Sequence, residues 1–207
     1  MTRRGQDSAS IPRTLGGSAV GEPDASRAQG DDRLPALEPA FPEAASLGRA
    51  LTNAGLTIAV AESCTGGLLG AALTAVAGSS AYVRGGVIAY ADDVKAEHLG
   101  VSRHLLATHG AVSAEVASAM ASGVRRRFEA SLGVGITGVA GPDASEQKPA
   151  GLVFVAVAGP ETARVVRLDG NHGRELNRAH AVQAALRLCA EVIATGAGSA
   201  PAPRGDA

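Results

Sequence analysis

The chain has 207 residues, of which 45% are hydrophobic and 19% are charged, and its formal net charge is −1 at pH 7. This length supports one well-filled core and is too short for two ordinary domains. Aromatic residues make up 2% of the chain and Trp is absent, so neither positive charge nor base stacking favours nucleic-acid binding. Any bound nucleotide is therefore expected to be small.

The two cysteines, Cys64 and Cys189, form neither a metal-ligand spacing nor a disulfide framework. No apolar run reaches the roughly 18 residues of a membrane span. The first five residues lead into polar sequence rather than into the apolar core of a signal peptide. We therefore expect a soluble protein of the reducing cytoplasm, with no membrane partner.

Both ends of the chain have the composition of flexible tails. Residues 1–40 mix Gly, Pro, Ser, Asp and Arg with isolated hydrophobic residues and no period, which cannot offset the entropy cost of ordering. Small residues also dominate from 196 to 207. The sequence predicts a disordered N-terminal tail (1–40), one folded domain (43–194) and a flexible C-terminal tail (196–207).

Apolar periodicity predicts helices and strands that alternate along the domain. Gly55 ends the first helical pattern in the usual C-terminal position, and Asp92 and Asp93 can cap the short helix that contains Lys95. Gly159-Pro160-Glu161 resembles a hairpin connection, so the last two strands are expected to be antiparallel. In chain order, the sequence predicts a helix at 43–54, strands at 56–61 and 83–90 with a helix at 65–77 between them, helices that follow Asp93, Ser102 and Ser113, strands at 132–137, 152–158 and 163–168, and a helix at 174–194.

Five strands interleaved with helices predict an α/β fold, namely a single three-layer α/β/α domain with a mixed, mainly five-stranded sheet. In open α/β sheets, ligands gather outside the carboxyl ends of the strands. The residues that follow the strands are therefore the first candidates for a functional site.

The most informative of these segments is Glu62-Ser63-Cys64-Thr65-Gly66-Gly67, which joins the first strand to the next helix. The first N–H groups of a helix lack partners inside it and favour negative charge. Ser63 could attack a carbonyl there while neighbouring N–H groups stabilise the oxyanion, if a base takes its proton. Alternatively, the serine is only an N-cap and Gly-Gly only a tight turn. Cys64 as the nucleophile would need a nearby His or a lowered thiol pKa, and the local sequence supplies neither.

Tyr90 and Lys95 leave the second strand at the same edge of the sheet and are the candidate activators of Ser63. Lysine has a reference pKa near 10.4, so it acts as a base near neutrality only if burial or a neighbouring cation lowers that value. Tyr90 could relay the proton. The alternative is a surface lysine on a short helix and a tyrosine that caps the core. A second wall of the site is expected in the glycine-rich turn at 138–143, whose small side chains let a ligand approach the backbone.

Several separated motifs agree in order and spacing with those of one known family. They are Ala61-Glu62-Ser63-Cys64-Thr65-Gly66-Gly67, Gly78-Ser79-Ser80, Tyr90, Lys95, Leu99-Gly100-Val101, His109-Gly110-Ala111-Val112-Ser113 and Gly138-Val139-Ala140-Gly141-Pro142. From residue 43 to residue 193 the chain closely resembles the CinA C-terminal-domain family, whose characterised members are nicotinamide-nucleotide amidases. The residues before Glu43 have no counterpart in the family. The chain also lacks the larger N-terminal domain of full-length CinA proteins, so we expect the stand-alone form.

The resemblance implies a role for each residue of the site. Ser63 matches the family's nucleophile, and Tyr90 and Lys95 match the tyrosine and lysine that assist it. Arg174 and Arg178 correspond to two phosphate-binding arginines one helical turn apart, although Asn171 and His172 alter the local spacing. The implied oxyanion and substrate-binding residues are Cys64, Thr65, Gly66, Gly67, Thr137, Gly138 and Gly141.

The reaction that the resemblance implies is hydrolysis of the carboxamide of nicotinamide mononucleotide to nicotinate mononucleotide and ammonia, in pyridine nucleotide recycling. It needs no metal and no cofactor. Two other classes stay open: a non-catalytic nucleotide-binding or regulatory module, and a structural or oligomer-forming domain in which Ser63 is only a cap. The expected partner is a small pyridine nucleotide, and assembly into a homo-oligomer is left open.

Overall fold

The computed structural model describes residues 37–145, 147–160 and 163–196, so most of both predicted tails lies outside the described residues. No described helix is long and apolar enough to cross a membrane. The elements are, in chain order, α1 (Leu37–Ala40), α2 (Pro42–Ala54), β1 (Ile58–Glu62), α3 (Leu68–Thr74), the 3₁₀ helix η2 (Ser79–Ala81), β2 (Val83–Ile88), α4 (Asp92–Leu99), α5 (Arg103–His109), α6 (Ala114–Arg127), β3 (Leu132–Gly138), β4 (Val153–Ala158), β5 (Ala163–Leu168) and α7 (Arg174–Ala194).

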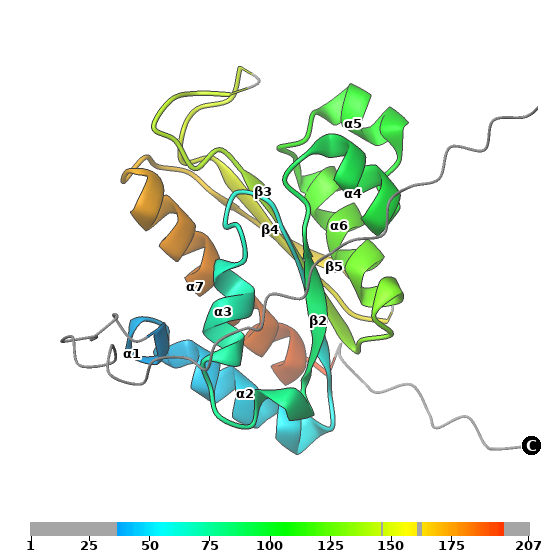
Figure 1. Cartoon of the computed structure of the whole chain (residues 1–207), viewed down its shortest axis with the longest axis vertical. Coiled ribbons are helices and arrows are strands. Elements are labelled where there is room, and N and C mark those ends of the chain that lie inside the picture. Colours follow the sequence, from blue (N-terminus) through cyan, green and yellow to red (C-terminus); the bar gives the residue numbers. More distant parts are fainter. Residues whose placement is uncertain (1–36, 146, 161–162, 197–207) are drawn as a thin grey trace, which may run out of the picture. The chain divides into compact units, whose positions relative to one another are not determined.

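The strands form one mixed five-stranded sheet in the order β2-β1-β3-β4-β5 (Figure 1). β1 pairs in parallel with β2 and with β3, whereas β3 pairs antiparallel with β4, and β4 with β5. The predicted antiparallel pairing of the last two strands is confirmed. Because β1, β2 and β3 run in the same direction, their carboxyl ends, at Glu62, Ile88 and Gly138, meet at one edge of the sheet.

Helices cover both faces of the sheet, which gives the three layers that the sequence predicts (Figure 1). On one face α2, α3 and α7 enclose the larger core, where Leu51 and Leu186 pack with Val134 of β3. On the other face α4, α5 and α6 enclose a smaller core, where Met120 and Ala59 are fully buried. The α/β class with a mixed five-stranded sheet is therefore confirmed.

Two glycines of β3 allow α6 to lie very close to the sheet. A Cβ atom at Gly133 would overlap the carbonyl oxygen of Ala121, and one at Gly135 would overlap that of Ala117. No side chain other than the hydrogen of glycine fits this approach. Since the Ser113 hydroxyl accepts the N–H of Val116 as the N-cap of α6, the same packing fixes the loop before this helix.

Three local differences from the sequence-based expectation have physical causes. The helix expected at 65–77 is shorter, because residues 63–67 form turns and α3 begins at Leu68. Neither Asp92 nor Asp93 is the N-cap of α4: Ala91 has that position and its side chain makes no capping bond, Asp92 binds Lys95, and Asp93 accepts the N–H of Val94 within the first turn. Residues 37–40, placed in the predicted tail, form α1, and Leu37 packs against the core, so they are not part of a disordered segment.

Candidate active site

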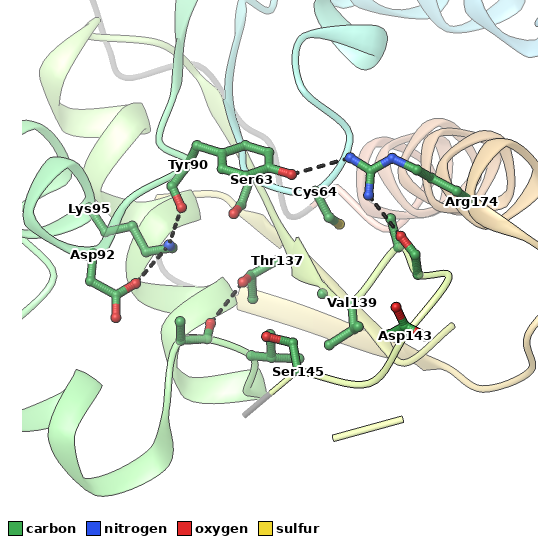
Figure 2. Close-up of a pocket in the computed structure, with 15 residues that line it drawn as sticks. Ser63, Cys64, Tyr90, Asp92, Lys95, Thr137, Val139, Asp143, Ser145 and Arg174 are labelled. Carbon is green, nitrogen blue, oxygen red and sulfur yellow. Dashed lines mark hydrogen bonds and ion pairs between the residues drawn. The ribbon is translucent and has the colours of Figure 1, made fainter. Parts of the chain in front are cut away.

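A cavity of about 240 Å³ opens at the carboxyl edge of β1 and β3 (Figure 2). Its walls come from the turn after β1, the start of α4, the loop before α6, the loop after β3 and the first residue of α7. The predicted site residues that line it are Ser63, Cys64, Tyr90, Lys95, Thr137, Gly138, Gly141 and Arg174. Thr65, Gly66, Gly67 and Arg178 are not among the lining residues.

Ser63 directly follows β1 and is held by the sheet. Its N–H donates to the carbonyl of Ile136 over 3.0 Å, which continues the pairing of β1 with β3 by one residue. Its carbonyl accepts the N–H of Gly66 over 3.0 Å and closes the turn. The serine is 8% exposed and faces the cavity, so the backbone holds a hydroxyl at a fixed point of the wall.

Glu62 occupies the N-terminus of α3. Its side chain is almost fully buried, and its carboxylate accepts the N–H groups of Gly67, Leu69 and Gly70 over 3.1, 3.0 and 2.8 Å. From the sequence alone, these N–H groups are expected to be available to a ligand. The carboxylate therefore replaces an external anion at this helix end.

The donors left for an oxyanion are fewer than the sequence predicts. Gly66 and Gly67 use their N–H groups inside the protein, as described above. Within the described part of the chain, the N–H groups of Cys64 and Thr65 donate to no backbone carbonyl, although the Cys64 N–H interacts with its own sulfur. The predicted oxyanion donors thus narrow to the two peptide N–H groups that directly follow Ser63.

Lys95 is 2% exposed and is the largest fully buried side chain among the described residues. Its Nζ atom donates to the carbonyl oxygen of Tyr90 over 3.2 Å and to Oδ1 of Asp92 over 2.9 Å (Figure 2). A protonated lysine has three donors, so these two bonds leave one N–H direction for the cavity. The surface position that was the alternative for Lys95 is therefore wrong.

Tyr90 contributes two different groups. Its carbonyl binds Lys95, while its side chain is 60% exposed and its hydroxyl accepts Nη2 of Arg174 over 3.3 Å. Nη1 of Arg174 also donates to the carbonyl of Gly141 over 2.9 Å. Figure 2 shows the resulting bridge, in which Arg174 connects the β2–α4 wall to the loop after β3. The alternative in which Tyr90 caps the core is wrong, because the ring lies at the mouth of the cavity.

The opposite wall is the loop before α6. The Thr137 hydroxyl donates to the carbonyl of Ala111 over 2.7 Å, and Lys148 donates to the carbonyl of His109 over 2.9 Å and to that of Val112. Thr137, a predicted substrate-binding residue, is 1% exposed, so its hydroxyl serves this wall. Thr137 of β3 and Lys148 of the following loop therefore both hold the loop before α6 through its carbonyl groups.

Cys64 is a poor nucleophile. Burial raises the pKa of its thiol to about 12, against smaller opposing effects that include the charges of Arg178 and Arg174. A thiol with such a pKa carries almost no thiolate near neutrality, and the thiolate is the reactive form. This agrees with the preference for Ser63.

Arg178 turns toward the Ser63 turn rather than into the cavity. Its Nε and Nη2 atoms donate to the carbonyl of Thr65 over 3.3 and 2.7 Å. Arg174, four residues earlier on α7, is the arginine that lines the cavity. The two arginines that the family resemblance groups together thus have different surroundings.

Sequence reasoning missed Asn177 and gave Glu62 no role. Asn177 is 3% exposed, donates to the carbonyl of Ala140 over 2.9 Å and accepts the N–H of His172 over 2.9 Å, so it fixes the loop after β3 against α7. The available signal was a polar residue at an apolar position of a helical pattern. For Glu62 the signal was an acid at the end of an otherwise apolar strand.

Among the residues that the structure describes, no group of three or more His, Cys, Asp or Glu could hold a metal ion.

The fold and the cavity define an α/β domain with a serine and a buried lysine at the carboxyl edge of its sheet. The chain belongs to the CinA C-terminal domain family, whose family model matches residues 41–193.

Among curated relatives, the CinA-like protein of Gemmatimonas aurantiaca is 54% identical over 146 residues, which are 69% of this chain and 34% of that protein. The CinA-like protein of Gloeobacter violaceus is 51% identical over 141 residues, 67% of this chain and 33% of that protein. The chain thus spans about a third of the length of the curated relatives that it matches.

Two solved structures show the same fold over most of this chain. The competence/damage inducible protein CihA from Agrobacterium tumefaciens is 39% identical with a TM-score of 0.69, over 73% of this chain and 97% of that chain. The competence damage-inducible protein A from Klebsiella pneumoniae is 35% identical with a TM-score of 0.73, over 75% and 97% of the two chains.

Proposed function

We propose that the chain is an amidohydrolase that deamidates nicotinamide mononucleotide to nicotinate mononucleotide and ammonia, with Ser63 as the nucleophile. The observation that carries this proposal is the shared cavity: Ser63, the buried Lys95 and the exposed Arg174 all line it. This arrangement supplies a hydroxyl, a proton-transfer group and a fixed positive charge within one small space. Family membership supports the proposal through the resemblance to characterised amidases.

In the first step, the Ser63 oxygen attacks the amide carbon and its proton passes to Lys95, which acts in its amine form. The negative charge on the amide oxygen is stabilised by the N–H groups of Cys64 and Thr65. The lysine ammonium that forms is held by the Tyr90 carbonyl and the Asp92 carboxylate, the two acceptors that already bind Nζ.

In the second step, the Lys95 ammonium gives its proton to the departing nitrogen, and ammonia leaves. Water then attacks the acyl-enzyme and passes a proton to Lys95. Lys95 gives this proton to the departing Ser63 oxygen, so that the carboxylic acid and the Ser63 hydroxyl are released and Lys95 returns to its amine form. Positioned acid–base groups typically contribute 10²–10⁴-fold to rate, and each oxyanion donor about 10²–10³-fold. The loss of either set should nearly abolish turnover.

Substrate size and charge support a mononucleotide. The cavity, at about 240 Å³, lies below the roughly 300–1,000 Å³ of sites that enclose whole drug-sized ligands. It therefore suits the nicotinamide ring and part of the ribose, with the phosphate at the mouth beside Arg174. Arginine suits this position because its planar donors can bind two phosphate oxygens at once.

A non-catalytic nucleotide-binding module is the second candidate function. It is favoured by the ion pair of Lys95 with Asp92, because an ammonium held by a carboxylate can bind a carbonyl without any proton transfer. Ammonia release separates the two candidates. Wild-type protein and the Ser63→Ala variant are incubated with nicotinamide mononucleotide, its riboside, free nicotinamide and the dinucleotide. Ammonia from the mononucleotide with wild type alone supports the amidase, and tight binding without ammonia supports the binding module.

A further inference from the structure

Arg178 makes a long-range contact with the turn that carries Ser63. It lies in the second turn of α7, 113 residues from Thr65 in sequence, and two of its nitrogen atoms converge on the Thr65 carbonyl oxygen. The shorter bond, from Nη2, measures 2.7 Å and is part-buried. Both donors are therefore directed to a backbone acceptor and not into the cavity.

The turn needs such a partner because its own side chains do not hold it. Thr65 is fully buried, and its hydroxyl has no hydrogen-bond partner in the described parts of the chain. On the other side of the turn, the Glu62 carboxylate already binds the N–H groups of Gly67, Leu69 and Gly70. Glu62 thus binds N–H groups that follow the turn. The Thr65 carbonyl accepts the N–H of Leu68 over 3.3 Å, and Arg178 adds the shorter bond of 2.7 Å from a side chain.

The orientation of this turn decides where the remaining donors lie. The Thr65 carbonyl shares one planar peptide unit with the N–H of Gly66, which donates to the Ser63 carbonyl, so a contact that holds this carbonyl also fixes the peptide unit that directly follows the Thr65 N–H. The N–H groups of Cys64 and Thr65 are those left for a substrate oxygen. The positive charge of Arg178 also reaches this point, since it stabilises negative charge on the Cys64 sulfur, although burial dominates there.

We propose that Arg178 is a positioning residue: it holds the Thr65 carbonyl so that the N–H groups of Cys64 and Thr65 stay directed at the oxyanion. This inference rests on the proposed amidase function. It competes with the role that the family resemblance implies, in which Arg178 binds the substrate phosphate. The two roles differ in which kinetic constant and which substrate they affect.

The experiment compares four variants of the full chain: Arg178→Ala, Arg178→Lys, Arg174→Ala and Arg187→Ala. Arg187 is the matched control, because it lies on the same helix with a side chain that is 65% exposed. The constants kcat and KM are measured for the mononucleotide and for the phosphate-free riboside. Melting temperature and circular dichroism confirm that each variant is folded.

For Arg178→Ala we expect kcat to fall about 10²–10³-fold for both substrates, the effect of losing an oxyanion donor, with KM changed less than about threefold. Methylguanidinium added to this variant should restore part of kcat, and Arg178→Lys should keep an intermediate rate. Arg187→Ala should behave as wild type. Arg174→Ala should act mainly on the KM for the mononucleotide.

A readout without turnover tests whether Arg178 holds the turn, separately from the proposed function. In Arg178→Ala the amide hydrogens of Gly66 and Gly67 should exchange at least about tenfold faster than in wild type, while those of Val192, farther along α7, should not change. If wild type releases no ammonia, the amidase proposal fails, and this exchange experiment decides alone whether Arg178 holds the turn.

Three results would overturn the inference. A loss confined to the mononucleotide and to KM would make Arg178 a phosphate ligand. Unchanged kcat together with unchanged amide exchange would leave it without a role in the turn. A lower melting temperature in both Arg178 variants, without rescue by methylguanidinium, would make it a residue of general stability.

Discussion

The Nζ atom of Lys95 lies 2.9 Å from Oδ1 of Asp92, and this short ion pair joins a buried residue to an exposed one: the two side chains are 2% and 53% exposed. Because the Asp92 carboxylate is half exposed, water screens this pair and limits its contribution to folding stability. The ion pair acts mainly on Lys95 itself, because it keeps a negative charge beside the amine that we expect to gain a proton during catalysis. Asp92 can therefore matter for activity more than for stability.

The Asp92→Asn variant tests this directly. It should lower kcat about 10–150-fold, because a hydrogen bond to a charged group contributes about 1.5–3 kcal/mol, while the melting temperature stays close to that of wild type. The matched control is Asp93→Asn, since the Asp93 carboxylate binds only the N–H of the next residue, Val94. Equal activity of the two variants would show that the Asp92 charge does not assist Lys95.

Ser63→Ala and Lys95→Met should each remove ammonia release from the mononucleotide. Methionine is chosen because it keeps most of the lysine volume at a fully buried position, where alanine would leave a cavity. The Ser63 change should alter stability by no more than about 0.5 kcal/mol. Turnover near the wild-type rate in either folded variant would contradict the assignment.

Cys64→Ala should keep most of the activity, and Cys64 in the native protein should resist alkylation. Because its pKa is about 12, only about one thiol in ten thousand is ionised at pH 8. Labelling with iodoacetamide at pH 8, read by mass spectrometry before and after denaturation, measures this. Cys189 is the internal control, since burial raises its pKa to about 12 as well. Fast labelling of Cys64 alone would reveal a reactive thiol.

Arg174→Ala should raise KM for the mononucleotide about 10–150-fold, which corresponds to the roughly 1.5–3 kcal/mol of a charge-assisted hydrogen bond. The riboside has no phosphate, so its kinetic constants should change little. The variant also frees the Tyr90 hydroxyl and the Gly141 carbonyl. An equal loss for both substrates would therefore mean that this bridge, and not phosphate binding, is the main role of Arg174.

A chain that begins at residue 37 should melt at the same temperature as the full chain and turn over at the same rate. One that begins at residue 43 loses Phe41, which is 4% exposed, and with it Leu37, which packs on the core. Loss of a buried Phe side chain costs about 3–5 kcal/mol, or roughly 6–20 °C for a domain of this size. Thermal unfolding of the two shortened chains checks this, and equal melting temperatures would show that α1 and Phe41 do not stabilise the domain.

The regular elements and the presence of Ser63 and Lys95 in the wall of one cavity could be predicted from the sequence, and the supports of the site could not. α7 begins and ends where its apolar period does, and both catalytic candidates follow parallel strands, which end at the same edge. Glu62 and Arg178, in contrast, bind backbone groups, and a backbone acceptor has no signature in the sequence. Only the folded chain brings Arg178 to a residue 113 positions away.

The closeness of α6 to β3 links the middle of the sheet to the site. Gly135 and Thr137 lie on the same strand, and the Thr137 hydroxyl binds the loop from which α6 starts. If alanine replaced Gly135, the added methyl group would push α6 outward, and the carbonyl of Ala111 would move with the start of the helix. The width of the cavity thus depends on the absence of a single carbon atom at Gly135, two residues before Thr137 in its wall.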